Sequence, residues 1–321
     1  MTDEMSVEAK EIKKKERKGK FKPLTVREWQ LYSMCSIPML LVFIFSYLPM
    51  YGIIIAFKNY KFDKGIWGSE WIGFRNFEFF VTSNEFTRLV RNTVGMNLIF
   101  MVVGLITAVG LAFLLYELQS RTLTKIFQTT LITPHFMSWV VVAYMLYAFI
   151  HPNHGIVQSI MVKMGMEKVD FYNKPEAWPL ILTISNVWKC VGMNSVVYYA
   201  ALMGFDASLI EAAKIDGAKK WQINVKIVLP SLIPIMTVLT IMDVGRIFSA
   251  DFGLFYQLPR DIGALYPTTD VINTYVFRAM RKLGDMGMST AVGLLQSVVG
   301  IIMVVTTNAI AKRVDESLSL F

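Results

Sequence analysis

Three ionisable side chains lie inside long apolar stretches of the sequence, where they can contact a polar solute that crosses a membrane. Lys189 lies in the middle of residues 177–205, and Asp243 and Arg246 interrupt residues 227–250. A central Lys or Arg costs about 2.5 to 3.5 kcal/mol on insertion scales, so it faces a cavity or a partner rather than lipid. We expect Lys189 and Arg246 to line a hydrated path and to hydrogen-bond hydroxyl or carboxylate groups. In the alternative, Asp243 and Arg246 pair only with each other, because they lie three residues apart on one helix.

Motifs for catalysis, nucleotide binding and metal binding are missing from the sequence. There is no GxxxxGK[ST] loop to hold phosphates and no GxSxG turn to present a nucleophile. His151 and His154 have a metal-like spacing, but His135 is the only other histidine and no HExxH motif accompanies them. We therefore expect neither an enzyme nor a metal site, and any energy source must be another subunit.

The composition indicates a protein embedded in a membrane. The chain has 321 residues, of which 54% are hydrophobic, and its mean hydropathy is +0.47, which is too apolar for a soluble domain. The formal charge of +8 does not indicate nucleic-acid binding, because nine of the 32 Lys and Arg residues fall in the first 27 positions, as in a basic juxtamembrane tail. Cys35 and Cys190 fall in apolar stretches and predict neither a disulfide framework nor a zinc site.

Apolar stretches of spanning length predict an all-α, polytopic membrane protein with six transmembrane helices. Residues 1–28 are charged and form a predicted cytoplasmic tail, and residues 29–321 form the transmembrane domain. The first stretch is too long for a signal peptide and is expected to be irregular near Pro38 and Pro49. The six predicted spans are residues 31–57, 92–116, 126–150, 177–205, 227–250 and 286–311.

The distribution of positive charge predicts the orientation of these helices. If the N-terminus is cytoplasmic, the segments on that side carry the higher density of Lys and Arg, although the N-terminal tail supplies most of the difference. This rule places both termini, and the connection between the fourth and fifth spans, in the cytoplasm.

The connection between the fourth and fifth spans is expected to begin with a short helix. Ser208 and Glu211 have the spacing of a capping box, so the helix is expected to start at Leu209. Gly217 is expected to end it, because glycine takes left-handed dihedrals without strain.

A second short helix is expected after this glycine. Trp221, Val225 and Val228 recur on one helical face, which is predicted to lie against the membrane domain. Pro230 then turns the chain back toward the membrane. The two helices together are predicted to protrude and to bind another protein.

This connection resembles the EAA loop of ABC importer permeases. The match consists of Glu-Ala-Ala, Gly and Ile-x-Leu-Pro, and it falls on Glu211, Ala212, Ala213, Gly217, Ile227, Leu229 and Pro230. Stretches such as SYLPMYGIIIAFKNYKF and STAVGLLQSVVGIIMVVTTNAIAKR extend the resemblance, from residue 30 onward, to permeases for oligosaccharides and polysaccharides.

The resemblance implies the permease subunit of an ATP-driven importer, which carries an oligosaccharide or polysaccharide fragment across the bacterial cytoplasmic membrane by alternating access. It also implies a second, similar permease subunit, two cytoplasmic ATPase subunits that bind ATP and Mg, and a solute-binding protein outside the membrane. The chain itself would hold no cofactor. Two alternatives remain open: an importer for a non-sugar solute, and a non-transporting membrane scaffold with a docking loop.

Residues of the EAA loop are expected to couple the chain to the ATPase. Glu211 would reach a basic residue of the ATPase, unless it serves only its own capping box. Ala212 and Ala213 would let the helix enter a groove, unless they are merely good helix formers. Asp216 and Gly217 would end the helix.

Aromatic and amide side chains at membrane depth complete the predicted substrate path. Aromatic rings stack on the apolar faces of sugars, but Trp and Tyr are also common at membrane interfaces, where Trp67, Trp71, Trp139 and Trp178 are expected. Amides bond hydroxyls, but they also hold helices together. Beside Lys189 and Arg246, the candidates are Asn186, Asn194, Gln296, Trp188, Tyr198, Tyr199, Phe248 and Tyr256.

Overall fold

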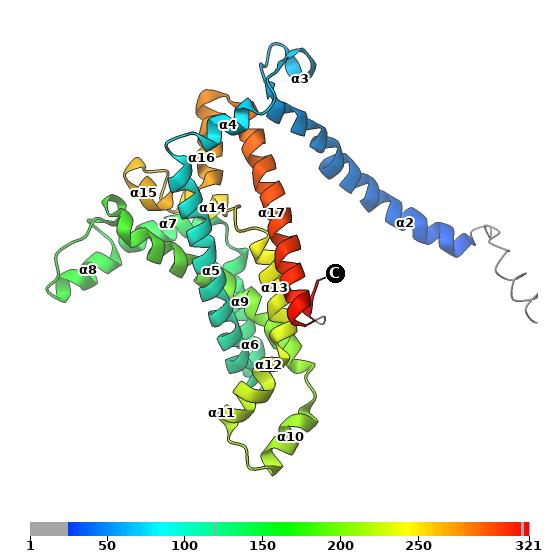
Figure 1. The fold of residues 1–321 in the computed structure, drawn as a ribbon. Coiled ribbons are helices and arrows are strands. Elements are labelled where there is room, and N and C mark those ends of the chain that lie inside the picture. The colour runs from blue at the N-terminus through cyan, green and yellow to red at the C-terminus, as the bar shows by residue number, and fades with distance from the viewer. Residues whose placement is uncertain (1–24, 119, 316–317, 321) are drawn as a thin grey trace, which may run out of the picture. The chain divides into compact units, whose positions relative to one another are not determined.

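The computed structural model describes residues 25–118, 120–315 and 318–320, and its backbone is helical almost throughout (Figure 1). The predicted all-α fold is confirmed, since the strands in these described ranges are only β1 (Lys58–Asn59) and β2 (Glu70–Trp71), which pair antiparallel. Most of the predicted tail, residues 1–28, lies outside the described residues. The chain divides into two units, Met1–Ile53 and Ile54–Phe321.

The first unit contains the first apolar helix. It begins as α2 (Val26–Val42), widens into a π-helix (Phe43–Tyr47) and continues as a 3₁₀-helix (Leu48–Phe57), whose last residues belong to the second unit. As a whole, this stretch is long and apolar enough to cross a membrane. Proline lacks the N–H that a helix bonds to an earlier carbonyl, and the irregularity predicted near Pro49 is confirmed, while α2 runs through Pro38.

In the described residues of the second unit, three unbroken helices are long and apolar enough to cross a membrane. They are α5 (Phe86–Tyr116), α9 (Trp178–Met203) and α17 (Met286–Val314). α5 begins before the predicted residue 92 and therefore includes Arg88 and Arg91 in its first turns.

Two further pairs of helices reach spanning length only when a bend lies within the span. α6 (Arg121–Ile132) continues into a 3₁₀ turn (Thr133–Phe136), and together they meet α7 (Trp139–Ile150) at 98°. The segment Lys220–Ser231 meets α13 (Ile233–Val244) at 53°. The described part of the chain thus holds four candidate spans, or six if each bent pair counts as one.

The third and fifth predicted spans are therefore not single helices. Pro134 lacks an N–H for the ladder of α6, and Ser138 starts α7 separately by accepting a hydrogen bond from the backbone N–H of Val141 at 3.3 Å. In the fifth span, α13 ends at Val244, so Arg246 lies in a turn beyond the helix.

Shorter elements connect the spanning helices. In Figure 1, α10 and α11 lie at the lower end of the second unit, and α4 and α16 lie near the opposite end. The shorter helices are α3 (Gly65–Gly68), α4 (Arg75–Val81), α8 (Ile156–Lys163), α10 (Ala207–Ile215), α11 (Lys220–Ile223), α12 (Leu229–Ser231), α14 (Phe252–Gln257), α15 (Tyr266–Thr269) and α16 (Ile272–Arg278), with π-helices Asn224–Val228 and Ala279–Leu283 and 3₁₀ turns Phe171–Asn173, Pro175–Ala177 and Gly263–Leu265.

The packing of the second unit centres on α5 and α9, which lie along each other. Ala108 and Ala112 of α5 are buried with Tyr198 and Leu202 of α9 in one apolar cluster. Small side chains on α5 allow this close approach of the two helices.

Trp178, at the start of α9, lies in the core. Its side chain is fully buried, and its Nε1–H donates to the carbonyl oxygen of Phe171 at 2.8 Å. This hydrogen bond satisfies the indole N–H and lets the whole ring be buried, so Trp178 packs inside the protein and not against lipid.

Gly192 lets α9 approach the end of α6. A Cβ at this position would lie 1.9 Å from the backbone carbonyl oxygen of Leu131. We expect Gly192→Ala to destabilise the protein by about 1 to 3 kcal/mol, the usual cost of overpacking, measured as a lower melting temperature of the purified protein in detergent. Gly95→Ala on α5 is the matched control, because no atom lies within 4 Å of its Cβ. Equal melting temperatures for the two variants would contradict the close approach.

Candidate functional site

The first candidate site is the helix α10, which begins earlier than predicted. Asp206 is its N-cap, and its Oδ1 accepts a hydrogen bond from the backbone N–H of Ser208 at 2.9 Å. This bond lowers the pKa of Asp206. The predicted capping box of Ser208 and Glu211, with a helix start at Leu209, is therefore wrong. The carboxylate of Glu211 is exposed and forms no ion pair with any residue that the structure describes.

Gly217 ends this helix as predicted. Its φ of +78° lies in the left-handed region. Its N–H bonds the carbonyl of Lys214 at 3.1 Å, and the N–H of Ala218 bonds the carbonyl of Ala213 at 2.9 Å. This pair of bonds is a Schellman motif, in which glycine is favoured at the left-handed position.

The two alanines of α10 lie in different environments. Ala213 is buried in an apolar cluster of its own chain, together with Tyr198 and Leu202 of α9. Ala212 is exposed, and Ile215 is 86% exposed. Ile215 lies three and four residues after Ala212 and Glu211, so the three exposed side chains share one face of α10, which we call the candidate docking surface. Ile215 could not be found from the family pattern, because that pattern does not specify its position.

The second helix of the connection presents a different face from the predicted one. Trp221 and Val225 are exposed, whereas Ile223 and Val228 are buried. The backbone of Asn224–Val228 is a π-helix, which bonds i to i+5 and so brings residues five apart onto one face. The predicted face of Trp221, Val225 and Val228 assumed the 3.6-residue period of an α-helix and is wrong.

A polar contact joins this second helix to the end of α5. Glu117 accepts hydrogen bonds from the Nζ of Lys220 at 3.1 Å and from the Nδ2 of Asn224 at 3.0 Å. The bonds from Lys220 and Asn224 lower the pKa of Glu117. Beside this contact is a cavity of about 770 Å³, and Tyr199 of the predicted path is one of its lining residues.

The second candidate site is a cavity of about 180 Å³ between α5, α9 and α13. It brings together three of the predicted path residues, Asn194, Tyr198 and Arg246, and adds Asp243. No ion pair joins Asp243 to Arg246 among the described residues, so the alternative in which they pair only with each other is not what the structure has. Their polar atoms are available to a solute in the cavity.

Arg246 also lines a larger cavity, of about 650 Å³, on its other side. This cavity includes Gln296 of α17, whose Nε2 donates to the backbone carbonyl of Phe248 and to Oδ1 of Asn273. Gln296 therefore holds α17 against the turn after α13. The ring of Phe248 packs on an apolar cluster that contains Phe80.

Lys189 is satisfied inside the protein and lines none of the cavities described above. Its side chain is buried, its Nζ donates to the carbonyl oxygen of His135 at 2.8 Å, and it lies 5.1 Å from the ring centroid of Trp139. It thus faces a partner across the bend between α6 and α7. Asn186 accepts a weak bond from the thiol of Cys190 at 3.7 Å, and Trp188 is exposed.

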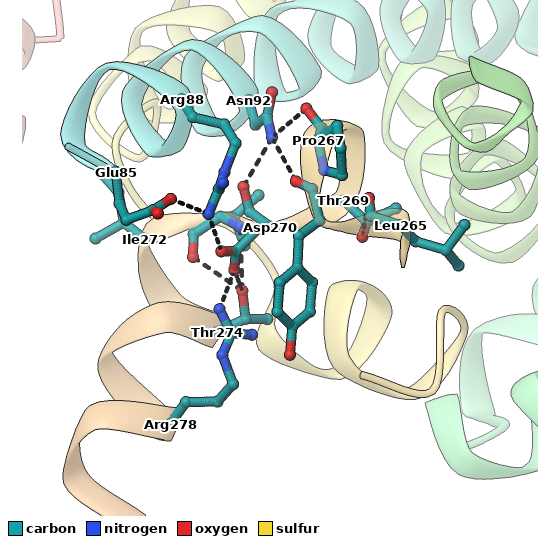
Figure 2. A network of polar contacts seen from close by, with 12 residues as sticks. Glu85, Arg88, Asn92, Leu265, Pro267, Thr269, Asp270, Ile272, Thr274 and Arg278 are labelled. Carbon is teal, nitrogen blue, oxygen red and sulfur yellow. Dashed lines mark hydrogen bonds and ion pairs between the residues drawn. The ribbon is translucent and has the colours of Figure 1, made fainter. Parts of the chain in front are cut away.

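A buried ionic network joins the start of α5 to α16 (Figure 2), and α16 lies near the end of the unit opposite α10 (Figure 1). Asp270 is 1% exposed, and its carboxylate contacts Arg88 of α5 at 3.1 Å as well as Arg278 of α16. Thr274 donates to the same carboxylate at 2.9 Å, and Asn92 donates to the backbone carbonyl of Asp270 at 3.0 Å. This network cannot be predicted from the sequence, because no local spacing connects positions 88 and 270.

Known proteins match this chain in sequence over most of its length. Residues 101–316 match the family described as "Binding-protein-dependent transport system inner membrane component". The chain is 32% identical to the polygalacturonan/rhamnogalacturonan transport system permease protein YteP of Bacillus subtilis (strain 168), over 95% of this chain and 94% of that one. It is 33% identical to protein LplB of the same organism, over 90% and 91% of the two chains.

A solved structure shares the fold. It is the crystal structure of a bacterial ABC transporter involved in the import of the acidic polysaccharide alginate, with a TM-score of 0.81 and 32% identity over 90% of this chain and 97% of that one. A second crystal structure, with a TM-score of 0.80, has the alginate transporter in complex with an alginate pentasaccharide-bound periplasmic protein.

Proposed function

The chain belongs to the family of binding-protein-dependent transport system inner membrane components, and from this membership we propose that it imports an oligosaccharide or polysaccharide fragment by alternating access. The chain is a permease subunit of an ABC importer, located in the inner membrane, and not an enzyme. The observation that carries the proposed substrate is the similarity, over nine tenths of the chain or more, to permeases named for polygalacturonan and alginate. The cavity of Asn194, Tyr198, Asp243 and Arg246 supplies donors and acceptors suited to hydroxyl groups.

The proposed orientation has both termini and α10 in the cytoplasm. The density of Lys and Arg supports it. In this orientation Glu211, Ala212 and Ile215 face the side on which two ATPase subunits would bind ATP and Mg. A second permease subunit and an extracellular solute-binding protein complete the proposed importer.

The contacts of α10 suggest how a movement of the ATPase would reach the solute. Ala213 belongs to the same apolar cluster as Ala108 and Tyr198, and these two residues also line the 180 Å³ cavity. Because packed cores do not deform continuously, a displacement of α10 would carry the ends of α5 and α9 with it. The contact between Glu117 and Lys220 adds a second connection to α5.

The proposed function is tested by reconstituting the chain with its co-expressed partners in liposomes. We expect the chain to co-purify with an ATPase, and ATP hydrolysis to rise when an oligosaccharide-loaded binding protein is added. A complex that responds to a non-sugar solute instead would show that the proposed substrate is wrong. A chain that binds no ATPase would fit the scaffold alternative and contradict import.

Ile215→Asp is expected to weaken binding of the ATPase about tenfold or more, because a charge would replace an apolar side chain on the candidate docking surface. The measurement is the amount of ATPase that co-purifies at increasing dilution. Leu283→Asp is the matched control, since Leu283 is 77% exposed and lies beyond α16. Similar losses in both variants would indicate a general defect rather than a contact at Ile215.

A further inference from the structure

A small cavity between α7 and α14 is separate from the cavities described above. Its volume is about 220 Å³, which is below the range of roughly 300 to 1,000 Å³ typical of sites for drug-sized ligands and suits a single ring. In Figure 1 both helices lie away from α10, in the opposite part of the second unit. In the proposed orientation the cavity therefore opens in the outer half of the membrane domain. Its lining residues are Val140, Ala143, Tyr144, Tyr256, Gln257, Arg260 and Asp261.

Two lining residues of this cavity have an unfavourable backbone. Arg260 and Asp261 have φ angles of +58° and +50°, and the left-handed region costs a non-glycine residue about 1 to 2 kcal/mol. Such conformations persist only where the surroundings hold them, and they cluster at ligand sites. Here the carboxylate of Asp261 is held by Arg278 Nη1 at 2.9 Å and by the hydroxyl of Tyr266 at 3.0 Å. Arg278 is in turn held by Asp270.

Two charged residues, Arg260 and Asp261, line the cavity. The carboxylate of Asp261 is engaged by Arg278, which it shares with Asp270, and by the hydroxyl of Tyr266. Arg260 is exposed, forms no ion pair with any residue in the described ranges, and lies with its guanidinium carbon 4.4 Å from the ring centroid of Tyr147. A guanidinium stacked on a ring keeps its N–H groups free for a planar acceptor such as a carboxylate.

The aromatic side chains supply the remaining contacts. Tyr256 is fixed between Phe252, at 4.9 Å, and Phe277, at 5.1 Å, between ring centroids. Tyr144 is 66% exposed on the facing helix. Rings stack on the apolar face of a sugar, while phenol and amide groups bond its hydroxyls.

We propose that this cavity binds one acidic sugar residue of the imported glycan, with the sugar carboxylate on Arg260 and the ring against Tyr144 and Tyr256. The proposal rests on the proposed function and narrows its substrate class to carboxylate-bearing glycans. Neutral sugars would lack the bidentate contact, since only a carboxylate matches the fork of Arg260.

The test uses the whole importer, purified with its co-expressed partners but without the binding protein, and measures binding of trigalacturonate and of its carboxyl-reduced form. We expect the wild type to bind the acidic probe more tightly. Arg260→Gln is expected to weaken binding of the acidic probe about tenfold, as for loss of a charge-assisted bidentate contact, and to leave binding of the neutral probe unchanged. The affinity of Arg260→Lys for the acidic probe should lie between those of the wild type and of Arg260→Gln.

Arg281→Gln is the control, because Arg281 is a nearby cation that lies 5.9 Å from the Phe277 ring and is not part of the cavity lining. Equal affinity of the wild type for both probes, or equal losses in Arg260→Gln and Arg281→Gln, would overturn the proposal. An importer that carries neutral oligosaccharides and shows no carboxylate preference would contradict this proposal alone. An importer that carries no sugar would contradict the proposed function as well.

Discussion

Asp270→Ala is expected to destabilise the protein by about 3 kcal/mol or more, because charge-assisted hydrogen bonds from two arginines, each worth about 1.5 to 3 kcal/mol, are lost. The carboxylate is 1% exposed and contacts both Arg88 and Arg278. Its removal breaks both contacts and leaves Arg88 with Glu85, and Arg278 with Asp261, as the remaining counter-charges. It also removes the acceptor for the hydroxyl of Thr274. The measurement is the melting temperature of the purified chain in detergent.

Two comparisons separate this effect from the loss of any aspartate. Asp170→Ala removes a helix cap, in which Oδ1 accepts from the backbone N–H of Tyr172 at 3.0 Å, and an exposed hydrogen bond from the Nδ2 of Asn173 to Oδ2 at 2.7 Å. It is expected to cost about 0.5 to 2 kcal/mol. The double variant Asp270→Ala with Arg278→Met is expected to be more stable than additivity predicts, because each single change already breaks the contact between these two side chains. An Asp270→Ala variant as stable as Asp170→Ala would contradict the role assigned to the network.

The approximate positions of the candidate spanning segments can be predicted from the sequence, because each carries a long uncharged run. The bends cannot be predicted in this way, since the apolar composition of a run such as residues 126–150 does not distinguish one straight helix from two helices joined by a break. Pro134 marks the site of the first bend, but its angle of 98° depends on the separate N-cap at Ser138. Local composition predicts where a helix can break, and tertiary packing sets the direction of the next helix.

Only some residues of the predicted substrate path line a common cavity in the structure, for a similar reason. A charge at membrane depth must find a partner, but the sequence does not say which one. Lys189 finds the carbonyl oxygen of His135, whereas Arg246 lines two cavities. Asn194 and Tyr198 meet in one cavity because they lie four residues apart on α9, a spacing that places them on one face.

The face that is buried by the second helix of the connection depends on one π-helical turn. Residues with the 3.6-residue period were expected to be buried together, but the π-helix Asn224–Val228 buries Ile223 with Val228 instead. A π-turn has no reliable local sequence signature, so its effect on the phase of the helix is visible only in the structure. The pairing of Arg88 with Asp270 is hidden for another reason, since the two residues are 182 positions apart.

Gly217→Val is expected to abolish uptake while leaving membrane insertion and protein level unchanged. A β-branched residue at φ +78° is strained by more than the roughly 1 to 2 kcal/mol that an ordinary residue pays. The least costly response is to unwind the last turn of α10, because no atom blocks movement at this position. Ile215 and Ala213 lie in or next to that turn, so the docking surface and its anchor on the membrane helices would both shift.

Gly165→Val provides a control with the same local strain in a different place. Gly165 ends α8 with a φ of +77°, and its Schellman bonds match those of Gly217: its N–H bonds Val162 at 3.0 Å, and the N–H of Met166 bonds Met161 at 2.9 Å. Both glycines have open space around the position of a Cβ, so the two substitutions should cost similar stability. Only Gly217→Val, which lies beside the candidate docking surface, should stop uptake of a radiolabelled oligosaccharide by intact cells. Because folding cost is matched between the variants, normal uptake in Gly217→Val would show that the conformation of α10 does not transmit ATPase movement, and equal loss in both would attribute the effect to folding.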